Sequence, residues 1–173
     1  MYKPDAGPLA RRARGVGLAA AITILAATIP LTTTAAEMDP MVARGRYLVQ
    51  IAGCNDCHTP DYMFTDGAVD ESLWLTGTSL GWNGPWGTTY PPNLRLTAQR
   101  MTEDQWVVFA PAPKRPPMPW FNLRDMTPED VRAIYRYLKH LGPAGQPAPA
   151  ALPPGVDART PVFRAPDLPP PAK

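Results

Sequence analysis

Apolar and small residues recur at helical spacing between residues 40 and 53. Their positions follow one another by three, four and three residues, which places them on one stripe of an α-helix. The stripe consists of Val42, Gly45, Val49 and Ala52. Because Gly45 has no Cβ, we expect another helix to approach its backbone closely, with Ile134 and Tyr137 as the contacts.

A second helical pattern follows residue 128 and gathers five apolar side chains on one face. These are Val131, Ile134, Tyr135, Leu138 and Leu141. Gly142 and Pro143 end this pattern, since neither residue favours the continuation of a helix. A third, shorter helix is predicted from Thr102 onward.

The three predicted helices share one start signal. The capping residues are Asp39, Thr102 and Thr127. The side-chain oxygen of such a residue accepts a hydrogen bond from the free backbone N–H groups of the first turn. Gln105 follows Thr102 by three residues, which fits a capping box. We also expect Met101 and Met126, which precede two of the caps, to pack onto the first turns.

The stretch from Thr59 to about Arg100 is rich in glycine, proline and tryptophan and shows little periodicity. So long a loop is unusual inside a compact domain unless it wraps something. The pattern therefore predicts an all-α domain whose core is completed by a group other than protein.

The two ends of the chain differ from this central part. Residues 1–36 begin with a basic head, continue with an apolar run and end in small residues, which is typical of a secretory signal peptide. An uncleaved membrane anchor is the alternative, although the run is short for a bilayer span. We expect one domain over residues 37–143, followed by a Pro/Ala-rich tail over 144–173 that is extended or disordered.

Charge narrows the choice of partners. The whole chain carries a formal net charge of +2. Residues 1–36 contain four basic side chains and one acidic side chain, which together contribute +3. Without that segment the net charge is −1, so the composition gives no argument for nucleic-acid binding.

The two cysteines of the chain, Cys54 and Cys57, are three positions apart and His58 follows directly. Cys-x-x-Cys-His is the attachment signature of c-type haem, in which both thiols bond the porphyrin and the histidine ligates the iron. A disulfide would leave the histidine unexplained, and a thioredoxin-like pair needs a βαβ setting. A zinc site needs four ligands, and His140 is the one other histidine.

Met118 is our candidate for the ligand on the opposite side of the iron. It lies 60 residues after His58 within Pro-Pro-Met-Pro-Trp, and the prolines restrict the freedom of its loop. Met63 is only five residues past His58, too short a tether to reach the other face. The alternative for Met118 is an apolar plug, since methionine often fills gaps. Four tryptophans are expected to supply an apolar pocket or, alternatively, to pack loops; they are Trp74, Trp82, Trp86 and Trp120.

The sequence resembles the class I cytochromes c, and in particular the haem domains in the cytochrome subunits of membrane-bound alcohol and gluconate dehydrogenases. The matching segments are residues 45–48, 54–59, 86–94, 117–120, 126–130 and 137–138. The resemblance implies a small class I cytochrome c fold, with about three main helices and long loops around one covalent haem c. Cys54 and Cys57 would carry the haem, and His58 and Met118 would be its axial ligands.

The resemblance further implies that the segment from Trp86 through Tyr90 to Asn93 lines the haem near its propionates, with Trp120 also in the pocket. Those dehydrogenase subunits carry three haem motifs, whereas this chain has one. A relay through several haems within the chain is therefore excluded.

The function implied is single-electron transfer by an exported, periplasmic protein that is not itself an enzyme. Its partners would be redox proteins, such as a membrane-bound dehydrogenase or a terminal oxidase. The alternatives are a haem sensor or catalyst with a displaceable methionine ligand, and a docking subunit of a larger complex. Lys114 and Arg115 precede Met118, and we expect this edge to meet an acidic or polar partner surface.

Overall fold

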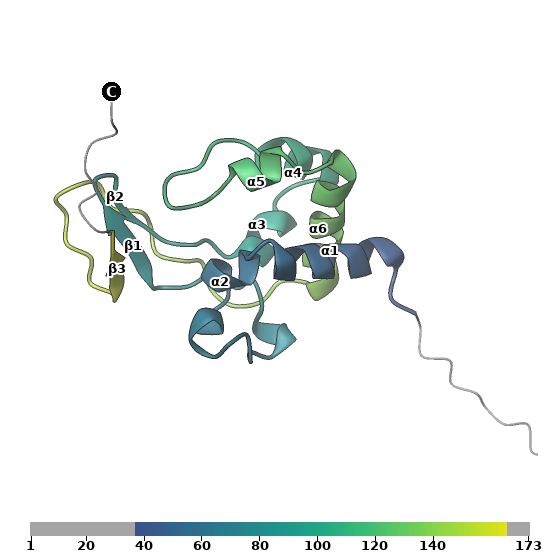
Figure 1. The fold of residues 1–173 in the computed structure, drawn as a ribbon, viewed down its shortest axis with the longest axis horizontal. Coiled ribbons are helices and arrows are strands. Elements are labelled where there is room, and N and C mark those ends of the chain that lie inside the picture. The colour runs from purple at the N-terminus through teal and green to yellow at the C-terminus, as the bar shows by residue number, and fades with distance from the viewer. Residues whose placement is uncertain (1–36, 166–173) are drawn as a thin grey trace, which may run out of the picture. The chain divides into compact units, whose positions relative to one another are not determined.

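The computed structural model describes residues 37–165, and helices account for most of its regular structure (Figure 1). The predicted signal peptide lies outside the described residues. The helices are α1 (Pro40–Ile51), α2 (Cys54–His58), α3 (Leu94–Gln99), α4 (Glu103–Phe109), α5 (Phe121–Arg124) and α6 (Pro128–Leu141). Two 3₁₀ turns, η1 (Tyr62–Phe64) and η2 (Glu71–Leu73), and three strands, β1 (Gly81–Gly84), β2 (Gly87–Thr89) and β3 (Val162–Arg164), complete the list. No helix between residues 37 and 165 has the length and apolar character needed to cross a bilayer.

The predicted helix starts are confirmed at all three caps. Asp39 accepts hydrogen bonds from the first backbone N–H groups of α1, at 2.8 Å from Met41. Thr102 and Gln105 form the expected capping box at the start of α4. Thr127 accepts from the backbone N–H of Asp130 at 3.1 Å. These bonds satisfy donors that the helix itself leaves free, so the local sequence fixes where each helix begins.

The crossing of α1 and α6 forms the centre of the domain. A Cβ atom on Gly45 would lie only 2.8 Å from Cβ of Tyr137 and closer still to the backbone carbonyl of Ala133. The predicted close approach at Gly45 is therefore confirmed, with Ala133 in the place that we assigned to Ile134. The buried core around the crossing contains Leu48, Val49, Trp74, Leu75, Trp106, Val131, Ile134, Tyr137 and Leu138.

The segment between α1 and α4 is more regular than its sequence pattern indicated. It contains both 3₁₀ turns, an antiparallel hairpin of β1 and β2, and helix α3. Asn93 caps α3 by accepting a hydrogen bond from the backbone N–H of Leu96 at 2.9 Å. These elements span three to six residues each, too few to show a period of their own in the sequence.

The described part of the predicted tail is extended and packs on the domain. Strand β3 pairs in parallel with β1, so the sheet order is β2-β1-β3. Leu152 forms an isolated antiparallel bridge with Thr88, and the Tyr90 hydroxyl lies 3.0 Å from the hydroxyl of Thr160. In Figure 1 this yellow segment runs back alongside the hairpin.

Candidate haem-binding site

Helix α2 brings the two cysteines and His58 together on little more than one turn. Gly53 separates α1 from α2 and adopts a left-handed conformation with φ of 68°, which glycine tolerates without strain. Both cysteines are half-buried and form no disulfide, whereas His58 is only 5% exposed. The chain thus presents two thiols and an imidazole from one short, fixed element.

The hydrogen bond of His58 defines which of its nitrogens can act as a ligand. Nδ1 of His58 lies 2.8 Å from the carbonyl oxygen of Pro92. Because a carbonyl only accepts, Nδ1 carries the proton and the Nε2 lone pair is free. Burial lowers the pKa of His58, and the bond to Pro92 opposes this effect. A neutral imidazole oriented by a backbone carbonyl is the form in which histidine binds metals.

The environment of the thiols argues against a redox-active cysteine pair. Burial, with a smaller contribution from Asp56, raises the pKa of Cys54 to about 12. Burial also raises the pKa of Cys57. Reactive dithiol motifs need a lowered thiol pKa. Among residues 37–165 there is also no group of three or more histidine, cysteine or acidic residues that could hold a metal ion alone.

A buried polar network that the sequence did not reveal holds α2 in place. The Thr59 hydroxyl donates to Oδ1 of Asn55 at 2.8 Å and accepts from the backbone N–H of Leu75 at 2.8 Å. The backbone N–H of Gly77 donates to the carbonyl of His58 at 2.7 Å. These bonds join α2 to residues 75–77, so the histidine is held from both its ring and its backbone.

Met118 is half-buried in the loop between α4 and α5. The Thr89 hydroxyl, at the end of β2, donates to the carbonyl of Pro116 at 2.8 Å and ties that loop to the hairpin. Three residues further on, Pro92 accepts the hydrogen bond from His58. The short segment 89–92 therefore contacts both the His58 ring and the loop of Met118. Figure 1 shows this loop extending from α4 toward β1 and β2.

The other predicted pocket residues have identifiable contacts within the protein. Asn93 is buried, and besides capping α3 its amide donates to the carbonyl of Ala144 at 2.7 Å. Trp86 is half-buried at the hairpin turn, and its indole N–H donates to the carbonyl of Trp82 at 3.3 Å. Tyr90 is held by Thr160 as described above. Their roles toward a haem stay a prediction.

The remaining two tryptophans occupy different settings. Trp120 is half-buried just before α5, with the Arg124 guanidinium 5.5 Å from its ring centroid. Trp74 is 5% exposed, donates to the carbonyl of Val69 at 2.9 Å, and has the Arg46 guanidinium 5.2 Å from its ring centroid. The contacts of Trp74 thus join the loop of residues 69–74 to α1.

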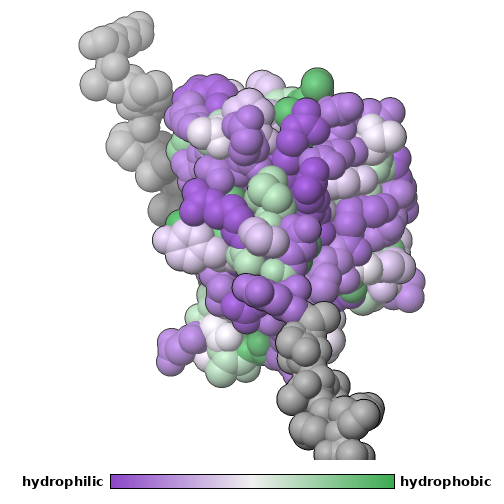
Figure 2. Space-filling view, turned by 90° about the vertical axis from the view of Figure 1, so that its right-hand side faces the viewer, coloured by the Kyte–Doolittle hydropathy of each residue, from purple (hydrophilic) through white to green (hydrophobic). Residues whose placement is uncertain are grey.

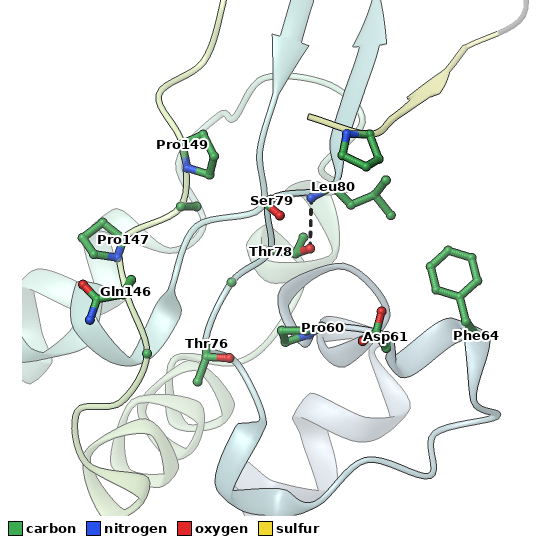
Figure 3. A pocket seen from close by; sticks show the side chains of 14 residues that line it. Pro60, Asp61, Phe64, Thr76, Thr78, Ser79, Leu80, Gln146, Pro147 and Pro149 are labelled. Carbon is green, nitrogen blue, oxygen red and sulfur yellow. Dashed lines mark hydrogen bonds between the residues drawn. The ribbon is translucent and has the colours of Figure 1, made fainter. Parts of the chain in front are cut away.

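A hollow in the surface of the domain lies away from this site. A cavity of about 700 Å³ lies between residues 60–80 and the C-terminal segment (Figure 3). Its lining includes Pro60, Thr76 and Pro147 and none of the predicted haem residues. The donor set on α2, by contrast, fits a covalently held haem: two neutral thiols and one neutral, oriented imidazole.

Comparisons with known proteins agree with this donor set. The family model of cytochrome c matches residues 42–142. The gluconate 2-dehydrogenase cytochrome c subunit of Pantoea cypripedii is 33% identical over 125 residues, which cover 62% of this chain and 28% of that protein. No solved structure matches the chain.

The matched region contains α2 with both cysteines and His58, the loop of Met118, and the crossing of α1 with α6. The motif on α2 accounts for one covalently bound haem c. The chain therefore belongs to the cytochrome c family, as a class I member that resembles dehydrogenase cytochrome subunits and has a haem-based electron-carrying role.

Proposed function

We propose that this cytochrome shuttles single electrons between redox partner proteins with His58 and Met118 as the two axial ligands of its iron. The bound haem supplies a one-electron couple between its ferrous and ferric states. The protein supplies the attachment, the orientation of the ligands and a surface for partners. The observation that carries the proposal is the hydrogen bond from Nδ1 of His58 to Pro92, which leaves Nε2 available.

The tie between Thr89 and Pro116 supports Met118 as the second ligand. A loop that is anchored loses less entropy when one of its side chains binds, so the sulfur needs little further ordering. With both axial positions filled by the chain, no position remains for an external ligand. This arrangement favours a carrier over the alternative of a haem sensor or catalyst.

Two finer features belong to the same proposal. Residues 1–36 have the composition of a secretory signal, so we place the mature protein in the periplasm, where c-type haem attachment is completed. The similarity to a gluconate 2-dehydrogenase cytochrome subunit points to a dehydrogenase as one partner. The chain spans about 28% of that relative's length.

Met118→Ala tests the ligand assignment. The purified, haem-loaded variant should retain covalent haem, lose the methionine–iron charge-transfer band, acquire a lower midpoint potential and bind carbon monoxide when reduced. Absorption spectra and potentiometry report these changes. Met63→Ala and Met126→Ala are the matched controls and should leave the band intact. Survival of the band in Met118→Ala, with its loss in either control, would assign the ligand to another methionine.

A further inference from the structure

The segment that follows α2 is acidic and contains no basic side chain to balance it. Between residues 47 and 94 the sequence has five acidic residues and neither lysine nor arginine. Glu71 is paired with Arg46 at 2.8 Å, and Asp70 caps η2. The other three, Asp56, Asp61 and Asp66, are exposed and form no ion pair with any residue between 37 and 165.

An exposed aromatic patch lies beside Asp56 and Asp61, and Asp66 follows one of its residues, Phe64, by two positions. We define the aromatic patch as Met63, Phe64, Trp82 and Phe163. Phe64 is 61% exposed, and its ring stacks on that of Phe163 with centroids 6.0 Å apart. Phe163 in turn lies 4.8 Å from Trp82. Apolar side chains gathered at a surface and rimmed by polar groups mark sites of protein interaction.

The aromatic patch adjoins one of the two haem-attachment cysteines. A small cavity of about 40 Å³ is lined by Cys57 together with Met63, Phe64 and Trp82. The aspartates Asp56 and Asp61 line the same cavity. In Figure 3, Asp61 and Phe64 lie across the larger cavity from Gln146, Pro147 and Pro149. A partner seated on the patch would therefore stand close to the thioether bond of Cys57.

Arg164, the basic residue that follows Phe163 in β3, is directed away from the patch. Phe163 pairs with Trp82 in the sheet, whereas its neighbour Arg164 pairs with Asn83 and binds its side-chain oxygen at 3.3 Å. Successive residues of a strand face opposite sides, so the charge of Arg164 lies on the face away from the patch. Figure 2 shows that the end of the domain with α6 and the start of α1 is predominantly hydrophilic.

Lys114 and Arg115, which the sequence suggested as a basic edge for a partner, differ in their exposure. The Lys114 ammonium is half-buried and donates at 2.7 Å to the carbonyls of Phe109 and Ala112. Burial also lowers the pKa of Lys114. Of the pair, Arg115 alone is exposed. The Lys114 ammonium is thus directed at its own loop, and the expectation that this edge meets an acidic or polar partner stays a prediction.

We propose that the aromatic patch, rimmed by Asp56, Asp61 and Asp66, is the surface through which this cytochrome exchanges electrons with its partner protein. Charge complementarity then requires a partner face with an apolar centre surrounded by lysine and arginine side chains. The inference rests on the proposed electron-transfer function. In the exchange one electron leaves the reduced cytochrome and reduces the partner by one electron, and no atom is transferred.

The first test uses two small oxidants of opposite charge. Stopped-flow absorbance follows oxidation of the reduced haem protein by tris(phenanthroline)cobalt(III), a cation, and by hexacyanoferrate(III), an anion. Each oxidant accepts one electron, giving cobalt(II) or hexacyanoferrate(II). The rim variant Asp56→Asn/Asp61→Asn/Asp66→Asn is compared with a control of equal charge change, Glu37→Gln/Glu129→Gln/Asp157→Asn. The control residues are exposed acids that form no ion pair within residues 37–165.

At low ionic strength the rim variant should react about fivefold more slowly with the cation and faster with the anion, and both differences should disappear at high salt. The control should change by less than about twofold. Equal behaviour of the rim and control variants would overturn the proposal. If the wild-type protein reacted with neither oxidant, the electron-transfer function itself would fail instead.

The second test does not depend on electron transfer. A peptide of four lysines around one tryptophan imitates the proposed partner face and is titrated into the ¹⁵N-labelled haem protein. Amide shifts should concentrate at residues 56–66 and at Phe163, and Phe64→Ser should weaken binding. Val108 is 75% exposed on α4, and Val108→Ser should leave the binding of the peptide unchanged. Shifts centred on Arg115 and α5, or spread over the whole domain, would contradict the assignment.

Discussion

Gly45 shows how one residue fixes the central contact of the fold. The absence of a side chain lets α6 bring Ala133 and Tyr137 against the backbone of α1. A side chain of any size at this position would have to occupy space that α6 already fills. The glycine therefore sets how closely α1 and α6 approach each other.

We predict that Gly45→Ala destabilises the protein by about 3 kcal/mol or more, because overpacking displaces backbone rather than a flexible side chain. Denaturant unfolding of the haem-loaded protein measures the change. The same substitution raises helix propensity, which alone would stabilise by up to about 1 kcal/mol. A stabilised variant would mean that α6 moves away from α1 without cost.

Asn93 makes a long-range contact that the sequence did not predict. The family resemblance implies a place beside the haem, which stays a prediction. The structure adds that the Asn93 side chain caps α3 and donates to the carbonyl of Ala144 in the C-terminal segment. The cap is a local pattern that could have been predicted. The contact with Ala144 joins residues 51 positions apart, and no sequence pattern reports such a pairing.

At the scale of elements, the end of α6 depends on a residue from another helix. Arg95 of α3 is 5% exposed and donates to the carbonyls of Leu141, Gly142 and Ser72. These carbonyls belong to the end of α6 and to η2, so one guanidinium joins three elements. Helix ends leave carbonyls without partners, and a buried end requires such a donor.

Arg95→Met should therefore lower the free energy of unfolding by about 3 kcal/mol, since three carbonyls lose a charged donor. Arg95→Lys should restore only part of this, because an ammonium cannot reproduce the spread of guanidinium donors. Arg100→Met, at an exposed residue at the end of α3, is the control and should change stability little. Equal losses of unfolding free energy in the Arg95 and Arg100 variants would show that Arg95 does not hold these three elements together.

Glu71 binds Arg46 of α1 and Tyr137 of α6, and its contribution to stability depends on pH. Its pKa lies below the ordinary value of 4.5, chiefly because of the hydrogen bond to Arg46 and further because of the Tyr137 hydroxyl. A lowered pKa contributes stability that is present above pH 4.5 and is lost as the pH falls through the folded-state value. Because the side chain is 36% exposed, solvent screening reduces the contribution.

We predict that Glu71→Gln is less stable than the wild-type protein by about 1 kcal/mol at pH 7 and that the difference narrows as the pH falls below 4.5. Denaturant unfolding at several pH values gives the difference directly, and acid effects common to both proteins cancel in it. Asp157→Asn, at an exposed residue without an ion pair among residues 37–165, should show a small and constant difference. A Glu71→Gln difference that does not narrow below pH 4.5 would assign the effect to packing.

Long elements could be predicted from the sequence and short ones could not. Helices α1 and α6 are 12 and 14 residues long, so their apolar stripes and caps identify them. The hairpin and α3 are too short to show a period, and β3 acquires its conformation by pairing with β1. The motif on α2 identified its chemistry from five residues, but the hydrogen bonds that orient His58 come from segments distant in sequence.

For the whole molecule, residues 143–165 extend the domain beyond the region that the family model matches. They contribute β3, the bridge at Leu152 and the contact at Thr160. The composition of this segment predicted an extended chain, since prolines exclude a helix. Its attachment to the hairpin depends on β1 and β2, which the sequence did not predict.

Truncation after Pro149 should lower the melting temperature by roughly 5 °C and preserve covalent haem, because it removes the sheet pairing and leaves α2 intact. Differential scanning calorimetry and the absorption spectrum measure the two properties. Truncation after Val156, which retains the Leu152 bridge but removes β3, should give an intermediate melting temperature. A melting temperature equal to that of the full chain would show that the segment adds no stability.

The uneven placement of charge has a physical consequence at long range. Outside residues 47–94, the described residues carry twelve basic and eight acidic side chains, against five acidic and no basic side chains inside that segment. The molecule is thus nearly neutral and yet has a permanent electric dipole. In the field of a charged surface such a dipole experiences a torque that rotates it before contact. This cytochrome should therefore adsorb on a positively charged electrode in one preferred orientation, with its acidic end toward the metal.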